Sequence, residues 1–148
     1  MTDVLQYEDL IERPEFQSLP YKVETTRSGQ IIMRPHLNIH SAFQRAIERK
    51  LEAHMSTPGV ALQEYAIQTK DGVKAPDVVW LSVEELAQTR AVRITPKAPQ
   101  ICVEVISKGN TAEEIANKKR LYMDAGAAEV WTCDLDGTMT FANEQGVL

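Results

Sequence analysis

The chain has 148 residues, of which 43% are hydrophobic and 25% charged, and its formal net charge at pH 7 is −5. This composition is that of an ordinary soluble globular protein, and the length suffices for one domain with a substantial core. We therefore expect a single domain over residues 1–148, with residues 1–20 as a lead-in segment. The acidic balance argues against a general nucleic-acid binder, because phosphate contacts normally require a basic surface.

No apolar run approaches the length that spans a membrane, and the N-terminal residues lack the basic start and apolar centre of a signal peptide. The sequence thus predicts a cytoplasmic protein with no membrane partner. Cys102 and Cys133 lie in apolar runs without CxxC spacing. We expect both to be buried free thiols rather than a disulfide or zinc ligands.

The first half of the chain predicts two short strands and a long helix. Residues 21–24 and 29–33 have strand composition and are separated by a turn that contains Gly29. A helix then begins at Asn38, a residue type that caps helices, and ends near Ser56. Its apolar residues recur at every fourth position: Ile39, Phe43, Ile47, Leu51 and Met55.

A polar line of His40, Gln44 and Glu48 lies one step round this helix from the apolar stripe. Two interpretations are open. The line is a solvated flank, which is the commoner case, or His40 or Glu48 reaches a functional site above the sheet.

The second half alternates strands with helices. Helices are predicted at two capping boxes, Ser82 with Glu85 and Thr111 with Glu114, and the second helix ends at Gly126. Strands are predicted over residues 60–69, 73–80, 99–107, 129–133 and 138–142. This order predicts an α/β fold, in the wider sense an α+β mixed sheet, with a central sheet flanked by helices on both faces.

Two carboxylates stand out because they occur inside apolar strands. Asp77 opens the run Val78-Val79-Trp80, and Glu104 lies within Ile101–Ser107. A buried acid is costly unless it is paired, hydrogen-bonded or bound to a metal, so the two acids suggest a shared polar site. Alternatively, Asp77 caps a turn after Pro76 and Glu104 faces water on an edge strand.

The donor set indicates which ion such a site would bind. Carboxylate oxygens without a Cys or His cluster suit Mg²⁺ or Mn²⁺ better than zinc. Such an ion can polarise a phosphodiester and lower the pKa of a bound water, as phosphodiester hydrolysis requires. Basic residues flank both strands and form either a local basic patch or ordinary solvated charges: Lys70, Lys74, Lys97, Lys108, Lys118, Lys119 and Arg120.

An ordered set of segments resembles a known family. The set comprises Gly29–Met33, the helix with His40, Pro76-Asp77, Val103–Ser107, Lys118–Tyr122, Ala125-Gly126, and Glu129-Val130-Trp131 with Asp134. Together they are similar to the Uma-two family of restriction endonucleases, which belongs to the PD-(D/E)XK nuclease superfamily. The resemblance implies a restriction-endonuclease-like core that acts on nucleic acid, most simply DNA. It also implies that Asp77 and Glu104 bind the metal while a lysine assists the attacking water.

The lysine departs from the superfamily pattern, because Ile106 stands where the ExK part of the motif has lysine. The resemblance implies that Lys118, four residues before Tyr122, supplies the group instead. Helical periodicity favours Lys119, which lies nearer the middle of the apolar stripe. We expect Lys118 to be the catalytic lysine, with Lys119 as the alternative.

Two functions remain open on the sequence: a metal-dependent DNA endonuclease, or a non-catalytic remnant of the fold that binds nucleic acid or protein. A homodimer that cuts both strands is a further possibility. Because paired acids repel each other without metal, we also expect that removal of either acid leaves the stability of the metal-free protein unchanged or raised.

Overall fold

The computed structural model describes residues 7–8, 12, 21–35 and 38–148. The predicted lead-in, residues 1–20, lies outside this range except at residues 7–8 and 12. The helices are α3 (Asn38–His54), α4 (Val83–Thr89) and α5 (Ala112–Asp124). The strands are β1 (Tyr21–Thr25), β2 (Ile31–Pro35), β3 (Gly59–Gln63), β4 (Ile67–Thr69), β5 (Gly72–Lys74), β6 (Val78–Ser82), β7 (Ile101–Val105), β8 (Glu129–Cys133), β9 (Met139–Asn143) and β10 (Gly146–Val147).

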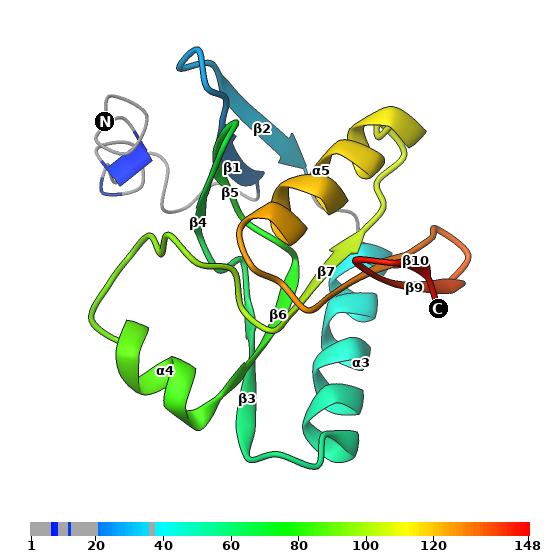
Figure 1. Cartoon of the computed structure of the whole chain (residues 1–148). Coiled ribbons are helices and arrows are strands. Elements are labelled where there is room, and N and C mark those ends of the chain that lie inside the picture. The colour runs from blue at the N-terminus through cyan, green and yellow to red at the C-terminus, as the bar shows by residue number, and fades with distance from the viewer. Residues whose placement is uncertain (1–6, 9–11, 13–20, 36–37) are drawn as a thin grey trace.

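A six-stranded mixed sheet forms the centre of the molecule (Figure 1). Its strand order is β10-β9-β8-β7-β6-β3, in which β7 and β8 are parallel and all other neighbours are antiparallel. Helix α5 connects the two parallel strands, as a parallel pair requires a long crossover. The predicted fold class, a central mixed sheet flanked by helices, is confirmed.

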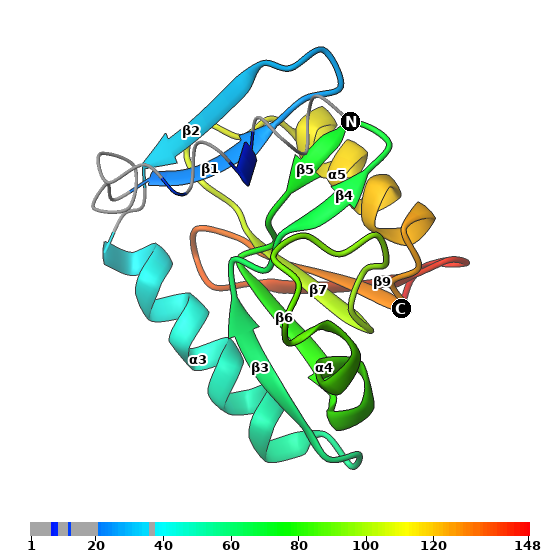
Figure 2. The ribbon, with the colours of Figure 1, turned by 90° about the vertical axis from the view of Figure 1, so that its left-hand side faces the viewer.

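The two faces of the sheet carry separate hydrophobic cores because side chains alternate along each strand. Val78 and Trp80 of β6 pack with Ile47 and Leu51 of α3 on one face. On the other face Val79 packs in a cluster that contains Tyr122 of α5. Figure 2 shows α3 and α5 on opposite sides of the sheet. Residues before β6 and within β7 can therefore meet groups from both layers.

A two-stranded ribbon, β1 with β2, lies beside α5 and the segment that follows β7 (Figure 2). The β4–β5 hairpin supports it, because the Val73 amide donates to Thr25 Oγ1 at 3.0 Å. Gly72 permits this close approach, since a Cβ on it would lie 2.5 Å from the carbonyl oxygen of Thr25, and its φ is +86°. The ribbon is thereby held against the end of the main sheet.

The predicted strand over residues 60–69 is wrong as a single element. The chain forms β3 in the main sheet and β4 in a separate hairpin, with the break at Glu64, whose φ is +50°. Residues of strand composition lie on both sides of the break, so the composition of this segment does not reveal the bend. The edge strand β10 was not predicted, because two residues carry no periodicity.

The predicted helix starts agree with the structure. Ser82 and Glu85 form a complete capping box on α4. At α5 the Thr111 hydroxyl accepts the Glu114 amide at 3.1 Å, while the Glu114 carboxylate pairs with Arg34 at 2.6 Å. Cys102 and Cys133 are buried and unbridged, as predicted. Among the described residues, none of the helices has the length and apolar character that a bilayer span requires.

Candidate active site

Asp77 lies between β5 and β6 and is almost completely buried, with 1% of its surface exposed. Its Oδ2 accepts the backbone N–H of Val105 at 2.7 Å. The amide of Gln44 on α3 donates to the Asp77 carbonyl at 3.0 Å. These bonds fix the acid beside the end of β7. Asp77 therefore does more than cap a turn after Pro76, because its carboxylate binds the end of β7.

Glu104, the fourth residue of β7, is also buried, with 4% of its surface exposed. Its carboxylate lies on the α5 side of the sheet, where Oε1 accepts from Lys118 Nζ at 3.1 Å. The Tyr122 hydroxyl lies 3.5 Å from Oε2. Strand β7 is central, between β6 and β8, so Glu104 is not on an edge strand. The structure thus brings Glu104 and Lys118, two of the predicted site residues, into direct contact.

Lys22 of β1 joins the two acids. Its ammonium lies 3.0 Å from Asp77 Oδ1, 3.1 Å from Glu104 Oε1 and 3.4 Å from Glu104 Oε2. The residue is buried, with 7% of its surface exposed. Asp77 and Glu104 therefore converge on one point, as the sequence predicted, and a positive charge from the protein itself lies there.

A third carboxylate, Glu24, lies on the same face of β1 as Lys22. Its Oε1 contacts Lys118 Nζ at 2.8 Å, and its Oε2 accepts the Ala75 amide at 2.7 Å. Oε2 is also 3.9 Å from the Lys22 ammonium. Lys118 is thus held between Glu24 and Glu104. We call Lys22, Glu24, Asp77, Glu104 and Lys118 the carboxylate–lysine cluster.

His40 borders this cluster. Its Nε2 lies 3.4 Å from Asp77 Oδ2, and the residue is buried. The favoured interpretation of the polar line on α3 as a solvated flank is therefore wrong at His40 and Gln44, both of which contact Asp77. Glu48 instead contacts the amide of Gln63 at the surface.

The pKa values of the three acids diverge because their partners differ. Burial alone would raise the pKa of Asp77, but Lys22, His40 and the Val105 amide outweigh it and hold this pKa well below its ordinary value. Burial likewise opposes Lys22 and Lys118 at Glu24, whose pKa is lowered. For Glu104 burial prevails over the same two lysines and its pKa is raised.

The pKa values of the cationic groups, Lys22 and His40, also depend on the balance between burial and charged partners. Burial would lower the pKa of Lys22, yet Glu104, Asp77 and Glu24 raise it well above its ordinary value. Burial also opposes Asp77 at His40, where the hydrogen bond to Asp77 prevails and the pKa is raised. The surrounding acids therefore favour the charged form of Lys22.

The donor set fits a hard divalent ion. Two carboxylates converge on one cation, the Lys22 ammonium, and Mg²⁺ is commonly held by one or two carboxylates together with water and substrate phosphates. Across the part of the chain that the structure describes, no group of three or more His, Cys, Asp or Glu side chains is arranged around a common ion position.

A narrow cavity of about 10 Å³ adjoins the cluster, which is roughly the volume that one water needs. Its lining includes Lys22, His40, Glu104 and Lys118 from the cluster and its border, together with Arg34 and Asn110. Lys118 is 13% exposed and Lys22 is 7% exposed, so Lys118 is the more accessible ammonium.

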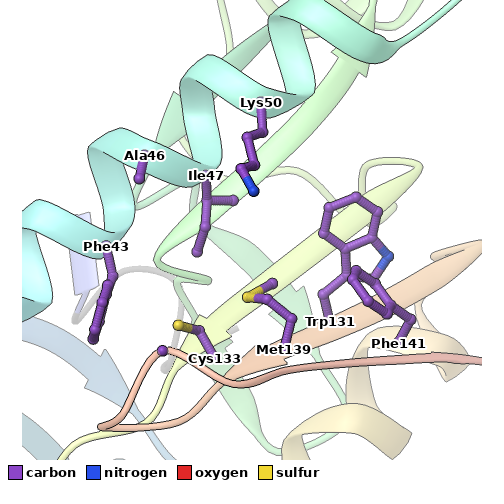
Figure 3. A pocket seen from close by; sticks show the side chains of 9 residues that line it. Phe43, Ala46, Ile47, Lys50, Trp131, Cys133, Met139 and Phe141 are labelled. Atoms are coloured by element: carbon purple, nitrogen blue, oxygen red, sulfur yellow. The ribbon is translucent and has the colours of Figure 1, made fainter.

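A larger apolar groove of about 190 Å³ lies between α3 and the β8–β9 strands (Figure 3). Phe43 and Lys50 extend into it from the helix, facing Trp131 and Met139 from the sheet (Figure 3). It shares no lining residue with the cavity beside the acids. The groove is therefore a separate feature from the candidate active site.

Lys22 and Glu24 were not predicted from the sequence as residues of the site. The signal was present, because these two charged residues occupy alternate positions of a predicted strand and so share one face. A strand whose charged face is buried must meet partners of opposite charge. Which partners these are depends on contacts 55 and 82 residues away in the chain, which local patterns do not reveal.

The central mixed sheet carries one buried acid directly before β6 and a second within β7, as the resemblance to restriction-endonuclease-like α/β proteins implied. Comparisons with known proteins agree with this class of protein. The family model of Uma2, described as "Putative restriction endonuclease", matches residues 7–144. The chain belongs to this family, the one named from sequence as Uma-two. Membership of this family supports a nuclease function, which implies a nucleic-acid substrate.

Among solved structures, the fold is similar to that of "a putative nuclease belonging to DUF820" from Anabaena variabilis. The TM-score is 0.72 with 19% sequence identity, over 90% of this chain and 80% of that one. At this identity the likeness concerns the fold. A search of curated proteins found no match.

Proposed function

We propose that this protein is a divalent-metal-dependent DNA endonuclease of the PD-(D/E)XK type. Asp77, Glu104 and Lys118 are its catalytic residues, and Asp77 and Glu104 are the ligands of Mg²⁺ or Mn²⁺. The observation that carries the proposal is the contact of Glu104 Oε1 with both the Lys22 and the Lys118 ammonium groups, each at 3.1 Å. The contact with Lys22 supports a position beside Glu104 where a cation can bind. The contact with Lys118 supports a catalytic lysine beside the same carboxylate.

The two acids would hold the ion from two places on the sheet, the residue directly before β6 and the fourth residue of β7. Asp77 is fixed by the Val105 amide at 2.7 Å, and Glu104 directly follows Val103, a residue of the core. A site supported by a sheet positions its ligands rigidly. When bound, the ion polarises the phosphodiester and lowers the pKa of water, as metal-assisted hydrolysis requires.

Lys118 orients the attacking water or stabilises the charge that develops on the phosphate. Glu24 at 2.8 Å and Glu104 at 3.1 Å hold its ammonium from two sides. It borders the small cavity next to the acids. This placement supports Lys118 over Lys119, because no contact between Lys119 and an acid of the cluster is found within the described residues.

The departure at Ile106 is consistent with this assignment. Ile106 follows β7, and its amide donates to the Cys133 carbonyl at 2.8 Å. A lysine from α5 reaches Glu104 without any contribution from position 106. Lys118 of α5 can therefore take the role that the lysine of the ExK motif has in the superfamily.

A second candidate function is a non-catalytic nucleic-acid-binding protein with this fold. One observation favours it: the Lys22 ammonium already lies between Asp77 and Glu104. In that case the ion pair is purely structural. Metal binding distinguishes the two candidates.

The test is cleavage of supercoiled plasmid, linear duplex and single-stranded DNA with Mg²⁺ or Mn²⁺. We expect chelator-sensitive cleavage by the wild type and a loss of at least about a hundredfold in Glu104→Gln. Glu113→Gln is the matched control, because Glu113 is an exposed acid in the first turn of α5. Equal cleavage by wild type and Glu104→Gln, or no cleavage of any substrate, contradicts the proposal.

A further inference from the structure

Lys22 is the only member of the carboxylate–lysine cluster that contacts both predicted metal ligands. Its ammonium makes contacts of 3.0 Å to Asp77 Oδ1 and 3.1 Å to Glu104 Oε1, with Glu104 Oε2 at 3.4 Å. Lys118, by contrast, contacts Glu104 and Glu24. The point that a bound ion would occupy thus coincides with the position of the Lys22 ammonium.

The backbone of Lys22 is fixed, but its side chain is not rigid. Lys22 pairs with Arg34 in the β1–β2 ribbon, and Thr25 at the end of β1 binds the β5 backbone. The ammonium itself is carried on a flexible four-carbon stem. The strand can therefore stay in place while the charged group moves.

A divalent ion and this ammonium exclude each other. Mg²⁺ takes oxygen ligands at about 2.0–2.1 Å, shorter than the nitrogen–oxygen contacts seen here. Two cations held by the same pair of buried carboxylates would also repel each other strongly. A metal that binds Asp77 and Glu104 must therefore displace the ammonium from between them.

We infer that Lys22 competes directly with the divalent ion for the Asp77–Glu104 carboxylate pair and so sets the metal affinity of the site. This inference rests on the proposed function. The displaced ammonium has an acceptor within reach, because Glu24 Oε2 already lies 3.9 Å away. The exchange therefore leaves the lysine paired inside the cluster.

The test measures Mn²⁺ binding by titration calorimetry on the metal-free protein, without reference to cleavage. Lys22→Met is expected to bind Mn²⁺ at least about tenfold more tightly than wild type, because the competing charge is gone. Its melting temperature should also rise more on addition of Mn²⁺ than that of wild type, by mass action. Lys119→Met removes the same charge from a half-buried position on α5 and should bind Mn²⁺ as wild type does.

Lys22→Met leaves three buried acids with fewer counter-charges and can reduce folding of the metal-free protein. The double variant Lys22→Met with Glu24→Gln removes one charge of each sign and keeps a hydrogen-bond acceptor for the Ala75 amide. It should also bind Mn²⁺ more tightly than wild type. Either tighter variant supports the inference, including the case in which wild type shows no measurable binding.

If wild type and both Lys22 variants bind Mn²⁺ with equal affinity, the inference fails while the metal-dependent function stands. If the Lys22 variants bind more weakly than wild type, Lys22 assists the ion and the inference fails as well. If none of the proteins binds Mn²⁺, both the inference and the metal dependence in the proposed function are wrong. The three results are distinguishable in one series of titrations.

Discussion

The amide of Val105 donates to Oδ2 of Asp77 across 2.7 Å, which joins the acid before β6 to the residue that follows Glu104. Neighbouring strands β6 and β7 are antiparallel, so the start of one lies beside the end of the other. This pairing brings two acids 27 residues apart in sequence to the same end of the sheet. The site is thus a consequence of strand register.

Replacement of Asp77 by Ala should destabilise the metal-free protein. It removes one of the carboxylate partners of the buried Lys22 ammonium and the Asp77 acceptor of the Val105 amide, and breaking a buried ion pair costs about 3 kcal/mol or more. Urea unfolding measures the loss. The exposed Asp124, 3.4 Å from Lys70, provides the control, and Asp124→Ala should cost less than about 1 kcal/mol.

This prediction reverses the one made from sequence, in which two unpaired acids repel each other. The structure pairs both acids with Lys22, so removal of either acid takes a partner from a buried positive charge instead of relieving repulsion. An Asp77→Ala protein as stable as wild type would contradict the ion-pair geometry.

Acid should destabilise the protein through Asp77 and Glu24. Their folded pKa values lie below the ordinary values of 3.8 and 4.5, so their contribution is present above those values and is lost as pH falls below about 4. Glu104 acts in the opposite sense: its raised pKa means that stability falls as pH rises above 4.5, the ordinary value for Glu.

Asp77→Asn tests the acid prediction, because Asn cannot titrate but can still accept the Val105 amide. Urea midpoints measured from about pH 6 to pH 3 should fall less steeply in this variant than in wild type. Parallel pH profiles for the two proteins would show that Asp77 is not held ionised by the cluster.

Lys118→Met should reduce DNA cleavage by about a hundredfold or more, while Lys119→Met retains it. The reason is position: Lys118 lies 3.1 Å from Glu104 and borders the small cavity. Initial rates on a cleavable substrate, at matched melting temperatures, provide the measurement. Cleavage that is lost in Lys119→Met and kept in Lys118→Met would identify the other lysine.

The sequence predicted the central strands and α5 well because each carries a local signal. Apolar runs marked β6 to β8, and Ser82 and Thr111 marked helix starts that the structure confirms. Asp77 and Glu104 stood out because acids are rare in such runs. Local chemistry was therefore sufficient to locate two of the five members of the cluster.

The burial of Lys22, Glu24 and His40 depends on distant partners. Local patterns therefore left two interpretations open for His40 and did not mark Lys22 and Glu24 as site residues. On α3 the predicted apolar stripe began with Ile39, yet Ile39 is 47% exposed and His40 is 6% exposed. The helix turns its polar His40 inward because Asp77 offers a hydrogen bond there. The periodicity of a sequence depends on hydrophobicity alone, so it does not indicate that a buried polar residue such as His40 has a hydrogen-bond partner.

Salt should weaken DNA binding, because contacts between lysines and phosphates release counterions. Lys108 is exposed in the segment after β7, close in sequence to Ser107 and Asn110 of the small cavity. Lys108→Ala should weaken binding and reduce the slope of log affinity against log salt by about 1. Lys50→Ala, at the separate apolar groove, is the control and should leave the slope unchanged.

Binding of a divalent ion by Asp77 and Glu104 is tested most directly by a crystal structure of the protein soaked in Mn²⁺, with anomalous scattering used to locate the ion. Such binding predicts an anomalous peak between the two carboxylates, with the Lys22 ammonium displaced from its contacts at 3.0 and 3.1 Å. A fully soaked crystal with no peak there, and with Lys22 still bridging the two acids, would contradict it.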